Sequence, residues 1–414
     1  MALLKWISLS YFGVLFEQVL VSAGNFLTIA ICAHMLSLGE QGKVMYAISL
    51  YIGLVVLNVA LYHYGAALIA PEFEDKRLYW VLLSRINALI SFSFSLIIAF
   101  AFYFLGPAFG WHMNTVEALV LFVYLFFQQL VDFDRRSKFI FRSYREAIVN
   151  SASVYPLRIS LLLLMHPDSF LSAGAILIVS SLIPVAFAMT RVMEKIRLNQ
   201  GIEPVKEILK RHFSFSVPFI LNAPLGWLCF YLPIYALGAI VGIEASAVLA
   251  SIRGLTNFAN VFMESLETVV PKIFSERFVK GGKDDLRRIT KRILYFGIVF
   301  WFFGAIMFSF FGRQIIGIVL GSRYLVYAKL LILLWSGVGL FFIVRVIGIY
   351  IRSKRVIYNE LAGSIAGILG LITTGIPLIK AYGIYGAGLA FLILPVFLFI
   401  GQQTANFIYK RRRM

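Results

Sequence analysis

Hydrophobic residues occur along this chain in long runs that short polar stretches separate. A helix needs about 20 apolar residues to cross the hydrocarbon core of a bilayer, and twelve runs are of about this length. Many contain Gly, Pro or Ser, which membrane helices tolerate better than soluble ones. The pattern predicts an all-α, polytopic membrane protein with about 12 transmembrane helices, at residues 9–36, 43–70, 80–105, 115–131, 146–165, 171–192, 214–240, 246–271, 293–311, 328–351, 359–379 and 386–406.

Lys and Arg alternate between the two sets of loops that join these predicted spans. The loops on one side, together with Lys5, carry 29 of the 38 basic residues, whereas the loops on the other side carry five. Arg85 belongs with the first set, and the remaining three are Arg158, Arg253 and Arg345, each inside a span. Basic residues collect in cytoplasmic loops. We therefore expect the richer side, and both termini, to be cytoplasmic.

Composition supports a membrane protein. Of 414 residues, 60% are hydrophobic and only 14% are charged, with a mean hydropathy of +0.87, whereas a soluble domain carries about 25% charged residues. The loop asymmetry explains most of the net charge of +18, so nucleic acid is not an expected partner. The first run has no small-residue cleavage site and is interpreted as a retained span. Cys32 and Cys229 lie in apolar runs and are interpreted as core residues.

The longest loop follows the sixth predicted span and reads EKIRLNQGIEPVKEILKRH. It divides the chain into an N-terminal six-helix bundle at 1–193, a cytoplasmic amphipathic linker at 194–213 and a C-terminal six-helix bundle at 214–414. The halves look alike, because MLSLGEQGKVMYAISL in the first corresponds to AIVGIEASAVLASIRGL in the second, with Glu40 opposite Glu244. Two similar bundles around a central cavity form the layout of alternating-access transporters; a duplicated scaffold is the alternative.

Enzyme signatures are missing from the sequence. The five histidines are scattered without metal-ligand spacing. There is no P-loop, and the glycines of YGIYGAGLA do not follow a strand. We expect no metal and no cofactor. The short outer loops also argue against a membrane enzyme, which would hold its acidic residues there.

The eighth predicted span has a polar stripe. Arg253, Asn257, Asn260, Glu264 and Glu267 follow one another at steps of 4, 3, 4 and 3 residues. These steps place all five on one helix face, over about 21 Å of its length. Such a stripe faces a protein interior or a water-filled cavity rather than lipid. We interpret it as a cavity wall; a structural network between helices is the alternative.

The first span has a weaker stripe, in which Gln18, Ser22 and Asn25 share a face and Glu17 lies beside it. The first and eighth spans are both expected to line the cavity. The predicted cavity-lining residues are Gln18, Asn25, Asn257 and Asn260.

Glu17, Glu264 and Glu267 are the acids that lie well within predicted spans. A partly desolvated carboxylate has a raised pKa and exchanges protons near neutral pH. These three are therefore candidates for proton coupling. The alternative is that each is paired with an intramembrane Arg, and Glu267 is close enough to the cytoplasmic end to be interfacial.

The three arginines inside spans differ in depth. Arg345 lies seven residues, or about 10 Å, from Arg352 at the cytoplasmic end, within reach of water by snorkelling. Arg253 is near the outer end of its span, whereas Arg158 is close to the middle of span five. Arg grips phosphate oxygens with two parallel hydrogen bonds and keeps its charge. All three are predicted to bind an anionic head group; structural pairing is the alternative.

The whole pattern resembles a known family of transporters. Three stretches carry the resemblance, together with the six-plus-six spans: LSLGEQGKVMYAISL at 36–50, IVLGSRYLVYAKLLILLW at 318–335 and YGIYGAGLAFLI at 382–393. Their order and spacing are similar to the polysaccharide-flippase (Wzx-like, O-antigen-unit) branch of the multidrug/oligosaccharidyl-lipid/polysaccharide exporter superfamily.

This resemblance implies a transporter rather than an enzyme. The expected function is translocation of an undecaprenyl-diphosphate-linked oligosaccharide from the cytoplasmic to the periplasmic leaflet of the bacterial inner membrane, coupled to protons. The expected partners are this substrate, the bilayer and other membrane proteins of polysaccharide assembly. Two alternatives stay open at this point: a drug or metabolite antiporter of the same superfamily, which should have an acidic cavity, and an enzyme that acts on lipid-linked sugars.

Overall fold

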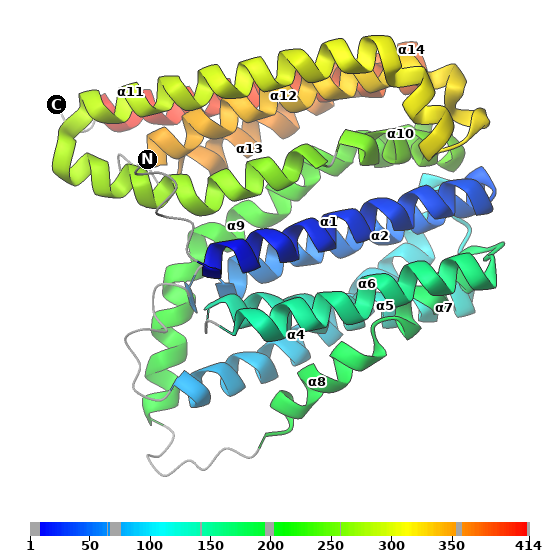
Figure 1. Ribbon diagram of the computed structural model, residues 1–414, viewed down its shortest axis with the longest axis horizontal. Coiled ribbons are helices and arrows are strands. Elements are labelled where there is room, and N and C mark those ends of the chain that lie inside the picture. Colours follow the sequence, from blue (N-terminus) through cyan, green and yellow to red (C-terminus); the bar gives the residue numbers. More distant parts are fainter. Residues whose placement is uncertain are drawn as a thin grey trace. The chain divides into compact units, whose positions relative to one another are not determined.

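The computed structural model describes residues 9–63, 65–66, 76–140, 143–194, 203–256, 258–352 and 358–411. Within these ranges the regular elements are helices, and no strand occurs (Figure 1). The chain divides into two compact units, Met1–Pro224 and Leu225–Met414. Residues 203–213 of the predicted linker form the first turns of a long helix, α9, which begins in the first unit and ends in the second.

The first unit is built from packed pairs of long helices. α1 packs on α6, α4 on α5, and α5 on α2, α7 and α8. At Gly24 of α1 a side chain would collide with the Tyr155 ring of α6, so a glycine there lets these helices approach closely. The elements are α1 (Leu9–Met35), α2 (Leu38–Asn58), the π-helix η2 (Val59–His63), α4 (Lys76–Leu105), the 3-10 helix η4 (Gly106–Phe109), α5 (Thr115–Ile140), α6 (Tyr144–Met165), α7 (Phe170–Val179), α8 (Leu182–Val192) and the start of α9 (Glu203–Ile240).

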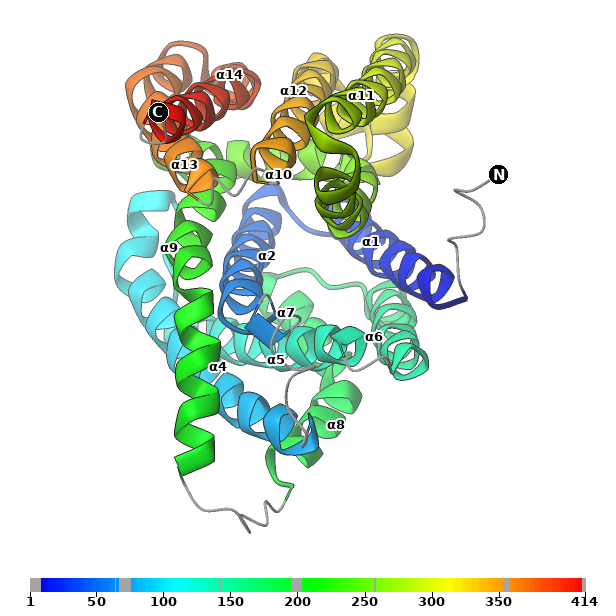
Figure 2. The same ribbon diagram turned by 90° about the vertical axis from the view of Figure 1, so that its left-hand side faces the viewer.

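The second unit contains two antiparallel helix pairs, which Figure 2 shows nearly end-on. Gly297 and Gly304 of α11 lie against Phe342 and Trp335 of α12, which fixes the antiparallel register of that pair. Its elements are the rest of α9, α10 (Ile243–Thr256), α11 (Phe258–Val319), the 3-10 helix η5 (Ser322–Tyr327), α12 (Ala328–Arg352), α13 (Asn359–Gly370), the π-helix η6 (Leu371–Gly375) and α14 (Ile376–Arg411).

A turn at Gly383 divides α14. The residue has φ 55° and ψ −128°, a left-handed backbone that glycine adopts without strain. Contacts between residues before and after the turn show that the chain reverses there. Gly370 lies against Phe397, and Gly401 lies against the carbonyl of Ala362. The predicted eleventh and twelfth spans are the two arms of this hairpin.

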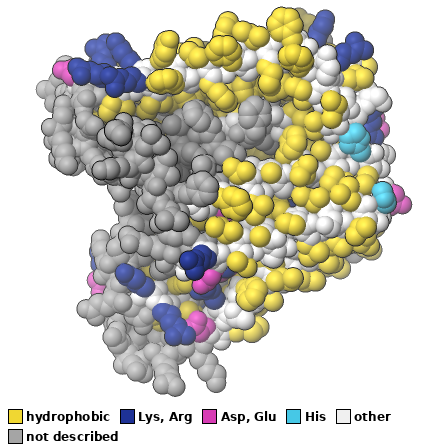
Figure 3. Space-filling model, viewed as in Figure 1, with side chains coloured by type: hydrophobic (Ala, Val, Ile, Leu, Met, Phe, Trp, Pro, Cys, Tyr) yellow, Lys and Arg dark blue, Asp and Glu magenta, His cyan; other side chains and the backbone are white. Residues whose placement is uncertain are grey.

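In the described ranges, nine helices are long and apolar enough to cross a membrane, and the bent pair of α7 and α8 makes ten. This number is smaller than the twelve predicted spans for two reasons. The last two predicted spans form one continuous helix, at residues 359–409, despite the turn at Gly383, and α10, which contains the start of the eighth predicted span, is too short to cross a membrane alone. Within the described residues, each of the twelve predicted runs lies mainly in helix. The all-α, polytopic fold predicted from the sequence is confirmed. Figure 3 shows hydrophobic side chains over the helices of each unit, with Lys and Arg toward the helix ends.

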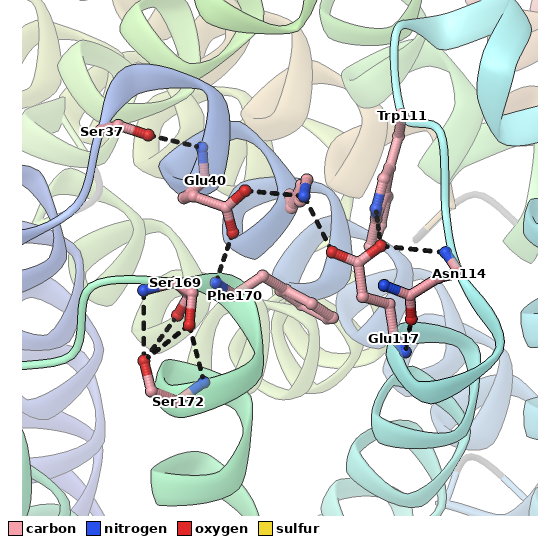
Figure 4. Close-up of polar contacts among 9 residues, drawn as sticks. Ser37, Glu40, Trp111, Asn114, Glu117, Ser169, Phe170 and Ser172 are labelled. Carbon is pink, nitrogen blue, oxygen red and sulfur yellow. Dashed lines mark hydrogen bonds and ion pairs between the residues drawn. The ribbon is translucent and has the colours of Figure 1, made fainter.

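A polar cluster joins the starts of three helices in the first unit (Figure 4). Lys43 of α2 lies 2.7 Å from Glu40 and 2.8 Å from Glu117 of α5. The Glu40 carboxylate accepts a hydrogen bond from the Phe170 N–H of α7 at 2.6 Å, and the Glu117 carboxylate accepts one from the Asn114 N–H at 3.2 Å. Carboxylates are stabilised at helix N-termini by the helix dipole. This cluster fixes α2, α5 and α7 at the end that the charge pattern assigns to the outside.

His212, near the start of α9, is buried within the first unit. Its Nε2 lies 2.8 Å from the Leu61 carbonyl oxygen in η2, and its Nδ1 lies 2.7 Å from the Tyr79 hydroxyl in α4. Because a carbonyl only accepts, Nε2 carries the proton and Nδ1 accepts from the Tyr79 hydroxyl. Burial lowers the pKa of the His212 imidazole below its usual value of 6.5, although the hydrogen bond to Leu61 opposes this shift. The fold therefore favours the neutral ring.

Acidification is expected to weaken this contact. The folded-state pKa of His212 is below the unfolded value, so the unfolded chain binds more protons and stability falls as pH drops below about 6.5. The melting temperature of the purified protein should decrease between about pH 7.5 and about pH 5.5. His212→Gln keeps a hydrogen-bonding side chain that does not titrate and should reduce the decrease. An identical decrease in both proteins would contradict the role of His212.

Candidate functional site

Arg158 of α6 is a buried guanidinium whose hydrogen-bond partners are neutral. Only 3% of the residue is exposed. Its Nε donates to Ser180 Oγ at 3.2 Å, its Nη2 donates to Gln128 Oε1 at 3.3 Å, and its guanidinium carbon lies 5.3 Å from the centre of the Tyr155 ring. Among the residues that the structure describes, no carboxylate forms an ion pair with Arg158.

The break between α7 and α8 explains how this charge is accommodated. The two helices meet at an angle of 52°, and Ser180 and Ser181 lie between them. Both hydroxyls donate to the Leu177 carbonyl, at 3.0 and 2.9 Å, while Ser180 accepts from Arg158 and Ser181 accepts from Gln128 at 2.5 Å. The C-terminus of α7 carries the negative end of the helix dipole, which stabilises a nearby cation.

The structure refines the depth of Arg158. α6 extends from Tyr144 to Met165, so Arg158 lies fourteen residues from the first and seven from the last. It is about 10 Å from the Met165 end of the helix, which the charge pattern assigns to the outside. Its burial nevertheless excludes snorkelling to water in this conformation.

Arg253 of α10 lies among aromatic rings in the second unit. Its Nη1 donates to the Phe230 carbonyl at 2.8 Å. The guanidinium carbon lies 4.8 Å from the centre of the Tyr231 ring and 4.7 Å from that of Phe391. Aromatic faces attract cations through their quadrupole. In the described part of the chain, none of the ion pairs includes Arg253, so its charge is held by rings and a carbonyl.

Arg345 is half-buried in α12, seven residues before the helix end at Arg352. This position, about 10 Å from the end, suits a long side chain that extends toward the interface. Arg158 belongs to the first unit, whereas Arg253 and Arg345 belong to the second. Their joint contribution to one cavity stays a prediction.

Glu17 of α1 is completely buried and paired with Arg135 of α5. Nη1 of Arg135 lies 2.9 and 3.1 Å from the two Glu17 oxygens, and the Ser151 hydroxyl donates to the same carboxylate at 2.6 Å. Nη2 of Arg135 donates to Asp132 at 2.7 Å, and Asp132 also accepts from Arg136 at 2.8 Å. Glu17 is therefore ion-paired, as the alternative interpretation held, but with an arginine that the sequence analysis placed in a loop and not within a span. Its role in proton coupling stays a prediction.

A second group of charges involves the same part of α5. Asp134 pairs with Lys138 at 2.7 Å and accepts from the Asn150 amide at 2.7 Å. Arg191 of α8 lies 3.4 Å from Asp134 and 3.1 Å from Glu146 of α6. The two groups together contain four carboxylates and four basic groups on α1, α5, α6 and α8. We refer to the two groups as the α5 network.

Sequence reasoning missed the α5 network because it treated the segment after span four as a basic loop. α5 continues to Ile140, and much of DFDRRSK at 132–138 is buried. The available signal was the alternation of acids and bases at spacings of three and four residues, which pairs opposite charges along one helix face.

The remaining predicted residues are not brought into a single arrangement. On α1, Gln18 is half-buried and Asn25 is exposed. Asn257 and the side chains of Asn260, Glu264 and Glu267 lie outside the described residues. The lining and proton-coupling roles of these residues stay predictions. Over the ranges given above, no group of three or more His, Cys, Asp or Glu side chains could hold a metal ion.

No protein-family model matches this sequence, and no curated protein matches it. Solved structures do match. A multidrug resistance MATE family transporter of the MOP superfamily, in an inward-facing conformation, has a TM-score of 0.69 and 12% identity, over 95% of this chain and 96% of that chain. The lipid II flippase MurJ, in an inward closed conformation, has a TM-score of 0.69 and 14% identity, over 96% and 87% of the two chains.

A third similar structure is a MOP superfamily transporter from Pyrococcus furiosus with a binding pocket of reverse polarity. Its TM-score is 0.59 at 14% identity, over 97% of this chain and 94% of that chain. At such low identity these likenesses establish the fold alone. This chain is a multi-pass membrane protein with the two-bundle fold of MOP superfamily transporters.

Proposed function

We propose that this protein is a flippase that moves an undecaprenyl-diphosphate-linked oligosaccharide from the cytoplasmic to the periplasmic leaflet of a bacterial inner membrane. The observation that carries the proposal is the distribution of charge within the spans. Arg158 and Arg253 are held by neutral groups, whereas the buried Glu17 is neutralised by Arg135. The described part of the interior is therefore electrostatically suited to an anion.

The chemistry of Arg158 and Arg253 fits a diphosphate. A guanidinium binds two phosphate oxygens at once and stays protonated at any physiological pH. Neutral hydroxyl, amide and carbonyl partners can be exchanged for phosphate oxygens without separating an ion pair. Arg158 is buried in this conformation, so substrate would reach it in a conformation in which its contacts with Gln128 or Ser180 have opened.

The proposed cycle follows the alternating-access layout of such folds. The oligosaccharide and diphosphate would occupy the central cavity that the sequence predicts, while the polyprenyl tail stays in lipid. Arg345 would meet the diphosphate at the cytoplasmic entrance. Gln18, Asn25, Asn257 and Asn260 would line the cavity, and Glu264 and Glu267 would couple transport to protons. Both termini would be cytoplasmic.

The second candidate is a drug or metabolite antiporter, which the likeness to a MATE family transporter keeps in view. An antiporter for organic cations requires an acidic group that is available to the cation or to a proton. Within the described spans, the fully buried Glu17 already pairs with Arg135 at 2.9 Å. This arrangement favours the flippase.

A deletion strain distinguishes the two functions. Loss of the gene should abolish the surface polysaccharide and cause lipid-linked oligosaccharide to accumulate, because translocation is the only step removed. The chain supplied on a plasmid should restore both. Drug susceptibility should be unchanged. Normal surface polysaccharide together with increased sensitivity to organic cations would support the antiporter and contradict the flippase.

A further inference from the structure

Two aromatic side chains form a short platform along α9 in the second unit. Trp227 and Tyr231 are one turn apart, so they lie on the same helix face. Their ring centres are 5.9 Å apart and their planes differ by 25°, so the two rings are nearly parallel. Both residues are half-buried rather than fully enclosed. We call this pair the aromatic platform.

The location of the aromatic platform is unusual for membrane aromatics. Trp and Tyr that anchor a helix in the interface lie at the ends of a span. Trp227 lies eleven residues after Ser216 and thirteen before Ile240, the limits of this span, and is therefore at its centre. Aromatic residues that only fill the core are fully enclosed, as Trp335 and Phe342 are in this unit. Trp227 lies at mid-span, and neither ring of the platform belongs to a fully enclosed residue, although Trp227 also contacts the buried Tyr235 at a ring-centre distance of 5.9 Å.

A cation lies directly beside the aromatic platform. The Arg253 guanidinium carbon is 4.8 Å from the centre of the Tyr231 ring, and one of its nitrogens donates to the Phe230 carbonyl in the same helix. Phe391 of α14 flanks the guanidinium at 4.7 Å and holds it in place. The chain thus places two nearly parallel aromatic rings next to a positive charge.

We propose that the aromatic platform binds the sugar residue next to the diphosphate, while Arg253 binds a phosphate of the same molecule. A pyranose ring has C–H groups on its faces and hydroxyls at its edge, so it stacks on an aromatic face while its hydroxyls find polar partners. A sugar phosphate combines this ring with an anion at the distance of one glycosidic linkage. The inference rests on the proposed function and extends it to a sugar-binding site.

The experiment compares two lipids that differ only in the glycan. Purified full-length protein in detergent is titrated with undecaprenyl diphosphate and with the same lipid carrying an oligosaccharide. Trp227→Ala should weaken binding of the glycosylated lipid about tenfold, the order expected for losing one aromatic contact, and should leave binding of the bare diphosphate unchanged. Trp227→Phe keeps a ring at this position and is the matched control, with most of the affinity retained. Tyr231→Leu should likewise weaken binding of the glycosylated lipid alone, and it replaces Trp227→Ala in the experiment if that variant does not fold.

Each outcome decides a separate question. If wild-type protein binds both lipids and Trp227→Ala and Tyr231→Leu bind the glycosylated lipid as tightly as wild type, the sugar site is excluded and the flippase stands. An equal loss for both lipids would show that the rings support the fold or Arg253, which also overturns the sugar site. If wild-type protein binds neither lipid, the proposed function fails and the sugar site fails with it.

Discussion

Arg158→Gln is expected to reduce translocation of lipid-linked oligosaccharide about 10- to 100-fold, the range that corresponds to a lost hydrogen bond to a charged group. Glutamine keeps hydrogen-bonding capacity toward Ser180 and Gln128, so the fold around the break between α7 and α8 should persist. It lacks the positive charge that the diphosphate requires. The measurement is the amount of surface polysaccharide in a deletion strain that expresses the variant, normalised to the amount of protein in the membrane.

Two comparisons separate substrate binding from structural support. Arg158→Lys keeps the charge but not the two-pronged geometry, and should retain partial activity. Arg313→Gln removes an exposed basic residue of α11 and should behave as wild type. Full polysaccharide display by Arg158→Gln or Arg158→Ala would exclude Arg158 from the site. Loss of the protein itself from the membrane would show that Arg158 mainly fixes the helix break.

Arg135→Gln is expected to destabilise the first unit by about 3–5 kcal/mol, because it leaves a buried carboxylate without its countercharge. Arg135 is only 7% exposed, and it is the residue that bridges Glu17 and Asp132. After its removal, Ser151 is the described partner that still donates to Glu17. The measurement is thermal unfolding of the purified protein, with the amount of folded protein in the membrane as a second readout.

The neighbouring residue provides a matched control. Arg136 also pairs with Asp132 but is 30% exposed, so Arg136→Gln should cost no more than about 1 kcal/mol. The double variant Glu17→Gln, Arg135→Gln removes both charges of the pair and should recover much of the lost stability. Equal melting temperatures for Arg135→Gln and Arg136→Gln would contradict the assignment of Arg135 as the buried bridge between Glu17 and Asp132.

The fold was accessible from the sequence because hydrophobic run length directly reports membrane-spanning helices. The run at 171–192 was predicted as one span, but its break at Ser180 and Ser181 was not predicted, since serine pairs inside apolar runs are common in membrane helices. The reversal at Gly383 was expected from the gap between the last two runs. Only the structure shows that glycine there adopts a left-handed backbone.

The site was less accessible, because side-chain partners come from distant parts of the chain. Arg158 and Arg253 were identified as buried charges from their positions alone. Their neutral partners Gln128, Ser180 and Phe230 were not, because spacing along one helix says nothing about the facing helix. The partner of Glu17 was missed for a different reason: 118 residues separate it from Arg135, in a segment interpreted as a loop.

Translocation in reconstituted vesicles tests the central claim most directly. Undecaprenyl-diphosphate-linked oligosaccharide is placed in the outer leaflet of the vesicles. A glycan-binding reagent that cannot cross the membrane then measures how much glycan remains in that leaflet over time. Wild-type protein should remove the glycan from the outer leaflet much faster than empty vesicles. The variant with both Arg158→Gln and Arg253→Gln should match empty vesicles. Equal rates for this double variant and wild type, or no translocation by folded wild-type protein, would contradict a cationic flippase.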